Sequence, residues 1–171
     1  MNPWADVEPI LMMPGETATL CARPYPGHPR GCPNFNRKPG CPRAAPRLPQ
    51  VLNLAEPVWA IWNVFDLAGH VVRMKARHPE WSDRQLRCCL YWQPRARRSL
   101  RRHVAMFLYH HPGLHVVATP EAQGVNVTAT MKSAGITLEW PPRNVAYQVV
   151  LAGTPLTPPP RVSTREGEGG P

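Results

Sequence analysis

The chain has 171 residues, of which 43% are hydrophobic, and it carries a formal net charge of +9. This length and apolar fraction suffice for one domain with a buried core and exclude a fully disordered chain. The basic charge is compatible with nucleic acid, an anionic membrane or an acidic protein as a partner, and it favours none of them. The 23 prolines gather toward the two ends of the sequence, which predicts a compact middle between a loop-rich front and a loose tail.

Two absences in the sequence bear on the cellular compartment. No apolar run approaches the roughly 20 residues that a membrane-spanning helix needs, and the first residues lack the charged and then apolar pattern of a secretory signal. We therefore expect a cytoplasmic protein that does not enter a membrane, and the oligomeric state is not indicated. In that compartment an odd count of five cysteines favours metal binding or redox chemistry over disulfide bonds.

The first third of the chain is predicted to be mostly irregular. Residues 1–20 form a lead-in that ends in a short strand at 17–20. Residues 21–50 form a loop rich in Cys, Pro and Gly, since proline interrupts both helices and central strands. Residues 51–56 connect this loop to the next element.

The middle of the chain, residues 57–111, is predicted to be helical. From Pro57, apolar residues recur at steps of three and four, so we expect a first helix that begins there. This helix ends at His78, because the residue before a proline is driven out of the helical conformation.

A capping box follows the first predicted helix. Ser82 and Gln85 have the residue types and the spacing of this motif, which predicts a second and shorter helix to about Tyr91. A third helix is expected over about 95–110, where apolar residues again recur with helical spacing.

The C-terminal part, residues 114–152, is predicted to be a β-α-β-β unit. Its helix begins at Thr119, because a Thr N-cap followed by Pro and an acid is typical of a helix start, and Glu121 is interpreted as that first-turn acid. The helix ends at Gly135, and the last two strands are near enough in sequence for a hairpin. The three strands are expected over residues 114–118, 136–140 and 145–151.

Together these elements predict an α+β fold in a single domain over residues 1–152. It consists of a three-helix core followed by the small β-α-β-β unit, with an N-terminal metal-binding loop rich in Cys, Pro and Gly. Residues 153–171 lack periodicity and are predicted to be a disordered tail.

Three cysteines in the loop form the strongest candidate site. Cys21, Cys32 and Cys41 have the spacing Cys-x10-Cys-x8-Cys, and the second and third stand in the same local sequence, Gly-Cys-Pro. A loop with so little apolar surface needs another source of free energy to become ordered, and metal binding supplies one. Paired zinc knuckles are absent, whereas each Cys-Pro pair resembles the last Cys-Pro of bacterial ferredoxin cluster motifs. We therefore predict an iron–sulfur cluster as the cofactor, with zinc as the alternative.

The fourth ligand of this centre is left open. His28 lies between the first two cysteines and would complete a Cys3His site suited to structural zinc. Cys88 or Cys89 would instead reach the loop from the second helix, although unpaired cysteines are also typical of apolar cores. An external group on an open iron of a [4Fe–4S] cluster is the third alternative.

The second candidate site is a cluster of arginines on the second and third predicted helices. Arginines bind phosphates through two parallel hydrogen bonds, and neighbouring aromatic rings stack on bases. The alternative is a solvated helix face. The candidate nucleic-acid-binding residues are Arg84, Arg87, Arg95, Arg98, Arg102 and Trp92.

These patterns predict a cytosolic metal-centre protein that carries an iron–sulfur cluster on three loop cysteines. The open iron would face a basic pocket lined by the arginines, with redox or sulfur chemistry on RNA, DNA or a nucleotide. The alternative functions are a structural zinc-binding module that binds nucleic acid without catalysis, and an adaptor that binds proteins through its Pro-rich segments. The motifs of common hydrolases and dehydrogenases are absent, and whether the protein is an enzyme is left open.

Overall fold

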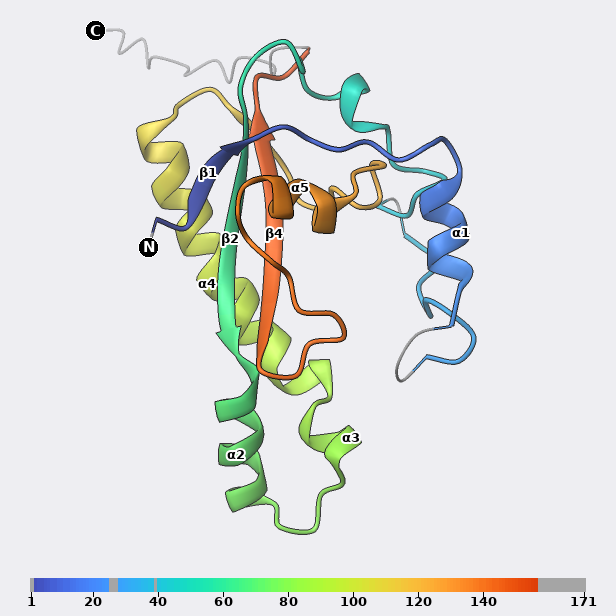
Figure 1. Cartoon of the computed structure of the whole chain (residues 1–171), viewed down its shortest axis with the longest axis vertical. Coiled ribbons are helices and arrows are strands. Elements are labelled where there is room, and N and C mark those ends of the chain that lie inside the picture. The colour runs from blue at the N-terminus through green and yellow to red at the C-terminus, as the bar shows by residue number, and fades with distance from the viewer. Residues whose placement is uncertain (1, 25–27, 39, 157–171) are drawn as a thin grey trace, which may run out of the picture.

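A computed structural model describes residues 2–24, 28–38 and 40–156 (Figure 1). As expected, the fold is of the α+β type, with helices and an antiparallel sheet. The elements are, in chain order, β1 (Trp4–Val7), α1 (Glu16–Ala22), the 3-10 turn η1 (Leu48–Gln50), β2 (Val58–Asp66), α2 (Leu67–Arg77), α3 (Asp83–Leu86), α4 (Cys89–His110), β3 (His115–Val117), α5 (Val127–Ser133) and β4 (Val145–Gly153).

The sheet is organised around two long central strands. Its strand order is β1-β2-β4-β3, and every neighbouring pair is antiparallel. β2 and β4 pair along their whole length, from Trp59↔Ala152 to Asp66↔Val145. β1 pairs only with the first half of β2, up to Ile61. The second half of β2 therefore has an outer edge that β1 does not cover.

Each face of the sheet is covered by apolar side chains. On one face α4 packs on the strands, and Phe107 is fully buried against Ile61, Val150 and the rings of neighbouring tryptophans. On the other face Trp62 packs with residues from η1, from the segment before α5 and from α5 itself. Burying one such large apolar side chain contributes roughly 1.5–3 kcal/mol, so both faces stabilise the sheet.

A smaller apolar cluster lies at the far end of the central strands, where α2 and α3 extend beyond the sheet (Figure 1). Phe65 and Trp92 stack there with ring centroids 5.2 Å apart, and Leu67 and Ala96 are buried beside them. This cluster joins the start of α4 to the junction of β2 and α2.

The prediction of a helix from Pro57 was wrong in its first half. Residues 58–66 form β2, and only residues 67–77 form a helix, α2. Because β2 is central and covered on both faces, its apolar residues do not alternate with polar ones, and such a run also fits a helical pattern. The carboxylate of Asp66 begins α2 by accepting a hydrogen bond of 2.7 Å from the Gly69 N–H. The predicted end at His78 is confirmed.

The three-helix core and the β-α-β-β unit are not found. The core is built on the sheet, and β4 pairs with β2 and β3. Residues 136–140 form no strand, since the segment before β4 folds on itself: the Glu139 carboxylate accepts hydrogen bonds from the Asn144 and Val145 N–H groups at 2.9 and 3.1 Å. The strand expected at 17–20 lies within helix α1.

Several local predictions are confirmed, and others shift along the chain. The capping box exists, since Gln85 Oε1 accepts hydrogen bonds from the Ser82 N–H and hydroxyl at 3.0 and 2.8 Å, but α3 is shorter than expected. α4 begins earlier than the third predicted helix and contains Pro94. The strands expected at 114–118 and 145–151 are found as β3 and β4.

The helix expected at Thr119 begins only at Val127, after a series of turns. The true N-cap of α5 is Asn126, whose side chain accepts a hydrogen bond of 3.0 Å from the Ala129 N–H. Gly135 has a φ of 77° and follows the last helical turn, as predicted.

Residues 153–156, the first four of the predicted tail, are part of the described fold. Gly153 belongs to β4, the Thr154 carbonyl accepts a hydrogen bond of 2.8 Å from the Asn53 N–H, and the Leu156 N–H donates one of 3.0 Å to Val51. The remainder of the predicted tail, residues 157–171, lies outside the described residues. Within the described part of the chain, no helix is both long and apolar enough to cross a membrane.

Candidate functional site

The segment that contains α1 and the cysteine loop, residues 21–41, is flanked on both sides by residues that are bonded to the turn before α5. Before α1, the Met12 N–H donates a hydrogen bond of 2.8 Å to the Gly124 carbonyl. After the loop, the Leu48 N–H donates one of 3.0 Å to the Gln123 carbonyl, and the Arg47 guanidinium donates to the Met12 carbonyl. The segments before α1 and after the loop therefore meet at the turn at 119–124, although the three segments are far apart in the sequence.

A close backbone contact brings Cys32 to Cys21. The Cys32 N–H donates a hydrogen bond of 2.8 Å to the Cys21 carbonyl. Gly31 makes this approach possible: its φ is +76°, and a Cβ at this position would lie 2.7 Å from the carbonyl oxygens of Cys21 and Ala22. The glycine before the second cysteine is thus required by space and by backbone conformation.

The third cysteine lies in the same loop, on the side of the turn at 119–124. Cys41 is buried, and its Sγ lies 3.0 Å from the Asn34 carbonyl oxygen, to which it donates a hydrogen bond. A Cβ on the preceding residue, Gly40, would lie 3.6 Å from Thr119 Oγ1. The chain around Cys41 therefore contacts the turn that carries Glu121.

The surroundings of Cys21 disfavour its charged form. Burial raises the pKa of the Cys21 thiol, and the charges of Cys32, Cys41 and Glu121 raise it further. The pKa of the Glu121 carboxyl is also raised, because surrounding protein atoms displace water from it although part of the residue stays exposed.

The sulfur atoms are nevertheless not arranged around one point. Among the described residues, no group of three or more His, Cys, Asp and Glu side chains has the geometry to hold a metal ion. All five cysteines are free thiols. The loop thus brings its thiols near one another without placing them in ligand positions.

The candidates for the fourth ligand are distributed over the molecule. His28 is half-buried in the loop, and its carbonyl accepts a hydrogen bond of 3.1 Å from the Gly31 N–H. Cys88 is the N-cap of α4 and Cys89 packs against the apolar cluster around Phe65, so Cys89 has the role of a core thiol.

The sequence did not reveal Glu121 as a site residue. The turn at 119–124 approaches the cysteine loop only through contacts between distant segments of the folded chain.

Arginines cover the outer side of α4. We call this set the α4 arginine surface, and all its members are exposed: Arg95, Arg97, Arg98, Arg101 and Arg102. None of them takes part in a salt bridge within the described residues. Arg84 of α3 is also exposed. Two exposed aromatic residues, Tyr91 and Tyr109, lie near the two ends of the helix.

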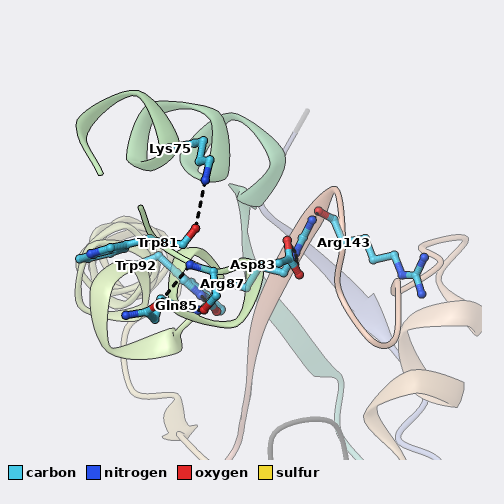
Figure 2. A network of polar contacts seen from close by, with 8 residues as sticks. Lys75, Trp81, Asp83, Gln85, Arg87, Trp92 and Arg143 are labelled. Atoms are coloured by element: carbon cyan, nitrogen blue, oxygen red, sulfur yellow. Dashed lines mark hydrogen bonds and ion pairs between the residues drawn. The ribbon is translucent and has the colours of Figure 1, made fainter. Parts of the chain in front are cut away.

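Two predicted nucleic-acid-binding residues have structural roles instead (Figure 2). Arg87 forms an ion pair with Asp83, with a distance of 2.9 Å from Nε to Oδ1, and donates a hydrogen bond of 3.0 Å to the Arg143 carbonyl. The side chain of Trp92 is buried against Phe65, and its Nε1–H donates a hydrogen bond of 3.2 Å to the Arg87 carbonyl. A ring buried in this way cannot stack on a base, so we remove Trp92 from the candidate surface.

The cysteine loop and the α4 arginine surface are separate. In Figure 1, α1 and the loop that follows it lie at the right of the sheet, whereas α4 lies behind the sheet and to its left. The expected basic pocket above an open iron is therefore not formed by the arginines of α4.

Comparison of the chain with protein-family models, curated proteins and solved structures finds no significant match. Any function is therefore inferred from the residues of this chain and their arrangement.

Proposed function

We propose that the chain binds an iron–sulfur cluster through Cys21, Cys32 and Cys41. The observation that carries the proposal is the contact at Gly31, where a left-handed glycine and the hydrogen bond from Cys32 to Cys21 hold two cysteine backbones together. This contact satisfies a carbonyl in the last turn of α1, and it brings two of the three loop cysteines together in the fold.

The electrostatics of the loop supports a cationic ligand. Burial raises the pKa of the Cys21 thiol, and electrostatic repulsion by Cys32, Cys41 and Glu121 raises it further. A metal centre removes the repulsion, because it binds the deprotonated thiols directly and its binding free energy adds to the stability of the loop. Glu121, from the turn that the loop contacts near Cys41, is one candidate for the fourth position, and His28 is the alternative that would suit zinc.

The α4 arginine surface supports a second part of the proposal, a phosphate-bearing ligand such as a nucleotide or nucleic acid. Arg95, Arg98 and Arg102 follow one another along the helix with spacings of three and four residues, and Arg84 lies on the neighbouring helix. Unpaired arginines attract phosphates. This surface is remote from the cysteine loop (Figure 1). We therefore favour a structural role for the iron–sulfur cluster, in which it orders the loop, over a chemical reaction of the cluster with the phosphate ligand.

The experiment is anaerobic purification of the full chain, followed by quantification of iron, acid-labile sulfide and zinc. We expect a brown protein whose visible absorption arises from charge transfer between thiolate and iron. Replacing Cys32→Ser should remove the colour and the iron, whereas the matched loop variant His28→Ala should keep both. The zinc-binding alternative predicts a colourless protein with stoichiometric zinc that is lost in His28→Ala. A protein that retains neither metal would refute both.

A further inference from the structure

A hollow lies beside the outer edge of β2, beyond the point where β1 ends. Residues of three elements line it: Asn63, Val64 and Asp66 from β2, Arg73 from α2, and Arg95 and Ser99 from α4. The hollow thus combines the uncovered edge of a strand with charged side chains from two helices.

The charge in this hollow is positive. Arg73 and Arg95 line it from different helices, and Asp66 is the carboxylate among its lining residues. One oxygen of Asp66 caps α2 by accepting from the Gly69 N–H, and the other lies 3.6 Å from an Arg73 nitrogen, in a loose and exposed ion pair. Arg95 has no salt bridge with any described residue. One arginine therefore remains without a counter-charge.

The polar groups of β2 add both a donor and an acceptor. The Trp62 N–H donates to the Pro3 carbonyl on the side of β1. Since backbone groups two residues apart on a strand point the same way, the Val64 N–H points toward the same edge, which β1 no longer covers there.

Asn63 is only 2% exposed, and its amide nitrogen donates a hydrogen bond of 3.1 Å to the Ala96 carbonyl. Its Oδ1 is a buried acceptor that has no hydrogen-bond partner in the described structure. Buried acceptors without a partner are uncommon, and a bound water, ion or ligand is one explanation for them.

We propose that this hollow binds a sugar phosphate, the unit shared by free nucleotides and nucleic acid strands. Arg73 and Arg95 bind the phosphate oxygens, Ser99 and the Val64 N–H donate further hydrogen bonds, and the sugar hydroxyls donate to Asn63 and Asp66. Two guanidinium groups from different helices hold a phosphate more firmly than one flat row of arginines does, since each approaches it from its own side. The proposal specifies the ligand class of the phosphate-binding part of the proposed function, and it does not depend on the metal centre.

The test is isothermal titration calorimetry on the full chain at low salt, with inorganic phosphate, ribose 5-phosphate and ribose as the probes. We expect ribose 5-phosphate to bind more tightly than phosphate, and ribose to give no measurable heat. Arg73→Gln and Arg95→Gln should each weaken binding of ribose 5-phosphate by about tenfold or more, because each removes charge-assisted hydrogen bonds. The matched control Arg77→Gln removes an equal charge from α2 outside the hollow and outside the α4 arginine surface, and it should weaken binding by less than about twofold.

Equal losses in Arg73→Gln and Arg77→Gln would overturn the proposal, because they would show that general surface charge binds the ligand. Unchanged binding in Arg73→Gln, or no binding of ribose 5-phosphate by the unmodified chain, would overturn it as well. Arg73→Lys retains the charge without the paired hydrogen bonds and should give an intermediate affinity. Iron and zinc measured in the same samples report on the metal centre separately, so the two proposals fail independently.

Discussion

Gly31 is the residue at which the cysteine loop depends most directly on one backbone conformation. Its φ of +76° is unfavourable for a residue with a Cβ, and replacing Gly31→Ala would place that Cβ 2.7 Å from two carbonyl oxygens, those of Cys21 and Ala22. Real Cβ contacts do not approach backbone this closely, so either the contact or the loop has to open. We expect Gly31→Ala to separate Cys32 from Cys21.

The size of the effect follows from two contributions. The left-handed conformation costs an alanine about 1–2 kcal/mol, and overpacking against backbone adds about 1–3 kcal/mol. The matched control is Gly113→Ala, since Gly113 has a φ of +85° and a Cβ there would meet nothing within 4 Å. The control therefore carries the conformational cost alone, and the difference between the two variants isolates the close contact.

The assay is the retention of metal by each variant during titration with a chelator, with far-ultraviolet circular dichroism to monitor the sheet. Gly31→Ala should release its metal at a chelator concentration at least about tenfold lower than the unmodified chain, because about 1.4 kcal/mol corresponds to a factor of ten. Gly113→Ala should retain metal as the unmodified chain does. Equal retention by Gly31→Ala and Gly113→Ala would refute the reasoning that the contact assembles the site.

Three further predictions concern the fold. Phe107→Ala should lower the free energy of unfolding by about 3–5 kcal/mol, since Phe107 is fully buried between α4 and the sheet; a loss below about 1 kcal/mol in urea denaturation would contradict this packing. The N–H groups of Val145 and Asn144 hold the pKa of Glu139 below its usual value of 4.5, so the carboxylate stabilises the fold above pH 4.5 and loses this effect as the pH falls through its lowered pKa. Glu139→Gln should therefore be less stable than the unmodified chain at pH 7, with a difference that shrinks below pH 4.5; a difference independent of pH would exclude this role. Ser82→Ala should lower stability by about 1 kcal/mol through loss of the capping box, and an unchanged thermal midpoint would show that the cap contributes nothing.

Predictions from local chemistry succeeded. The capping box at Ser82, the helix end at His78 and the left-handed position at Gly135 each depend on a few adjacent residues. The strand at Val145–Gly153 was also recognisable, because its β-branched residues favour an extended chain.

Features that depend on distant segments were missed. β2 looked helical because both of its faces are covered, and the sequence does not say which segments cover them. The approach of the loop near Cys41 to the turn that carries Glu121 accompanies hydrogen bonds that join Met12 and Leu48 to the same turn. Trp92 is buried and its neighbour Tyr91 is exposed. Which of the two side chains faces the core depends on how α4 lies on the rest of the fold. Local periodicity carries no information about such pairings.

The central claim is that the sulfur atoms of Cys21, Cys32 and Cys41 bind one metal centre. X-ray absorption at the metal edge of the anaerobically purified chain tests it most directly, because it measures the atoms bound to the metal. Our account predicts a shell of sulfur neighbours at about 2.3 Å that is lost when the three cysteines are replaced by serine. A metal surrounded only by oxygen and nitrogen, or a sulfur shell that survives the replacement, would contradict it.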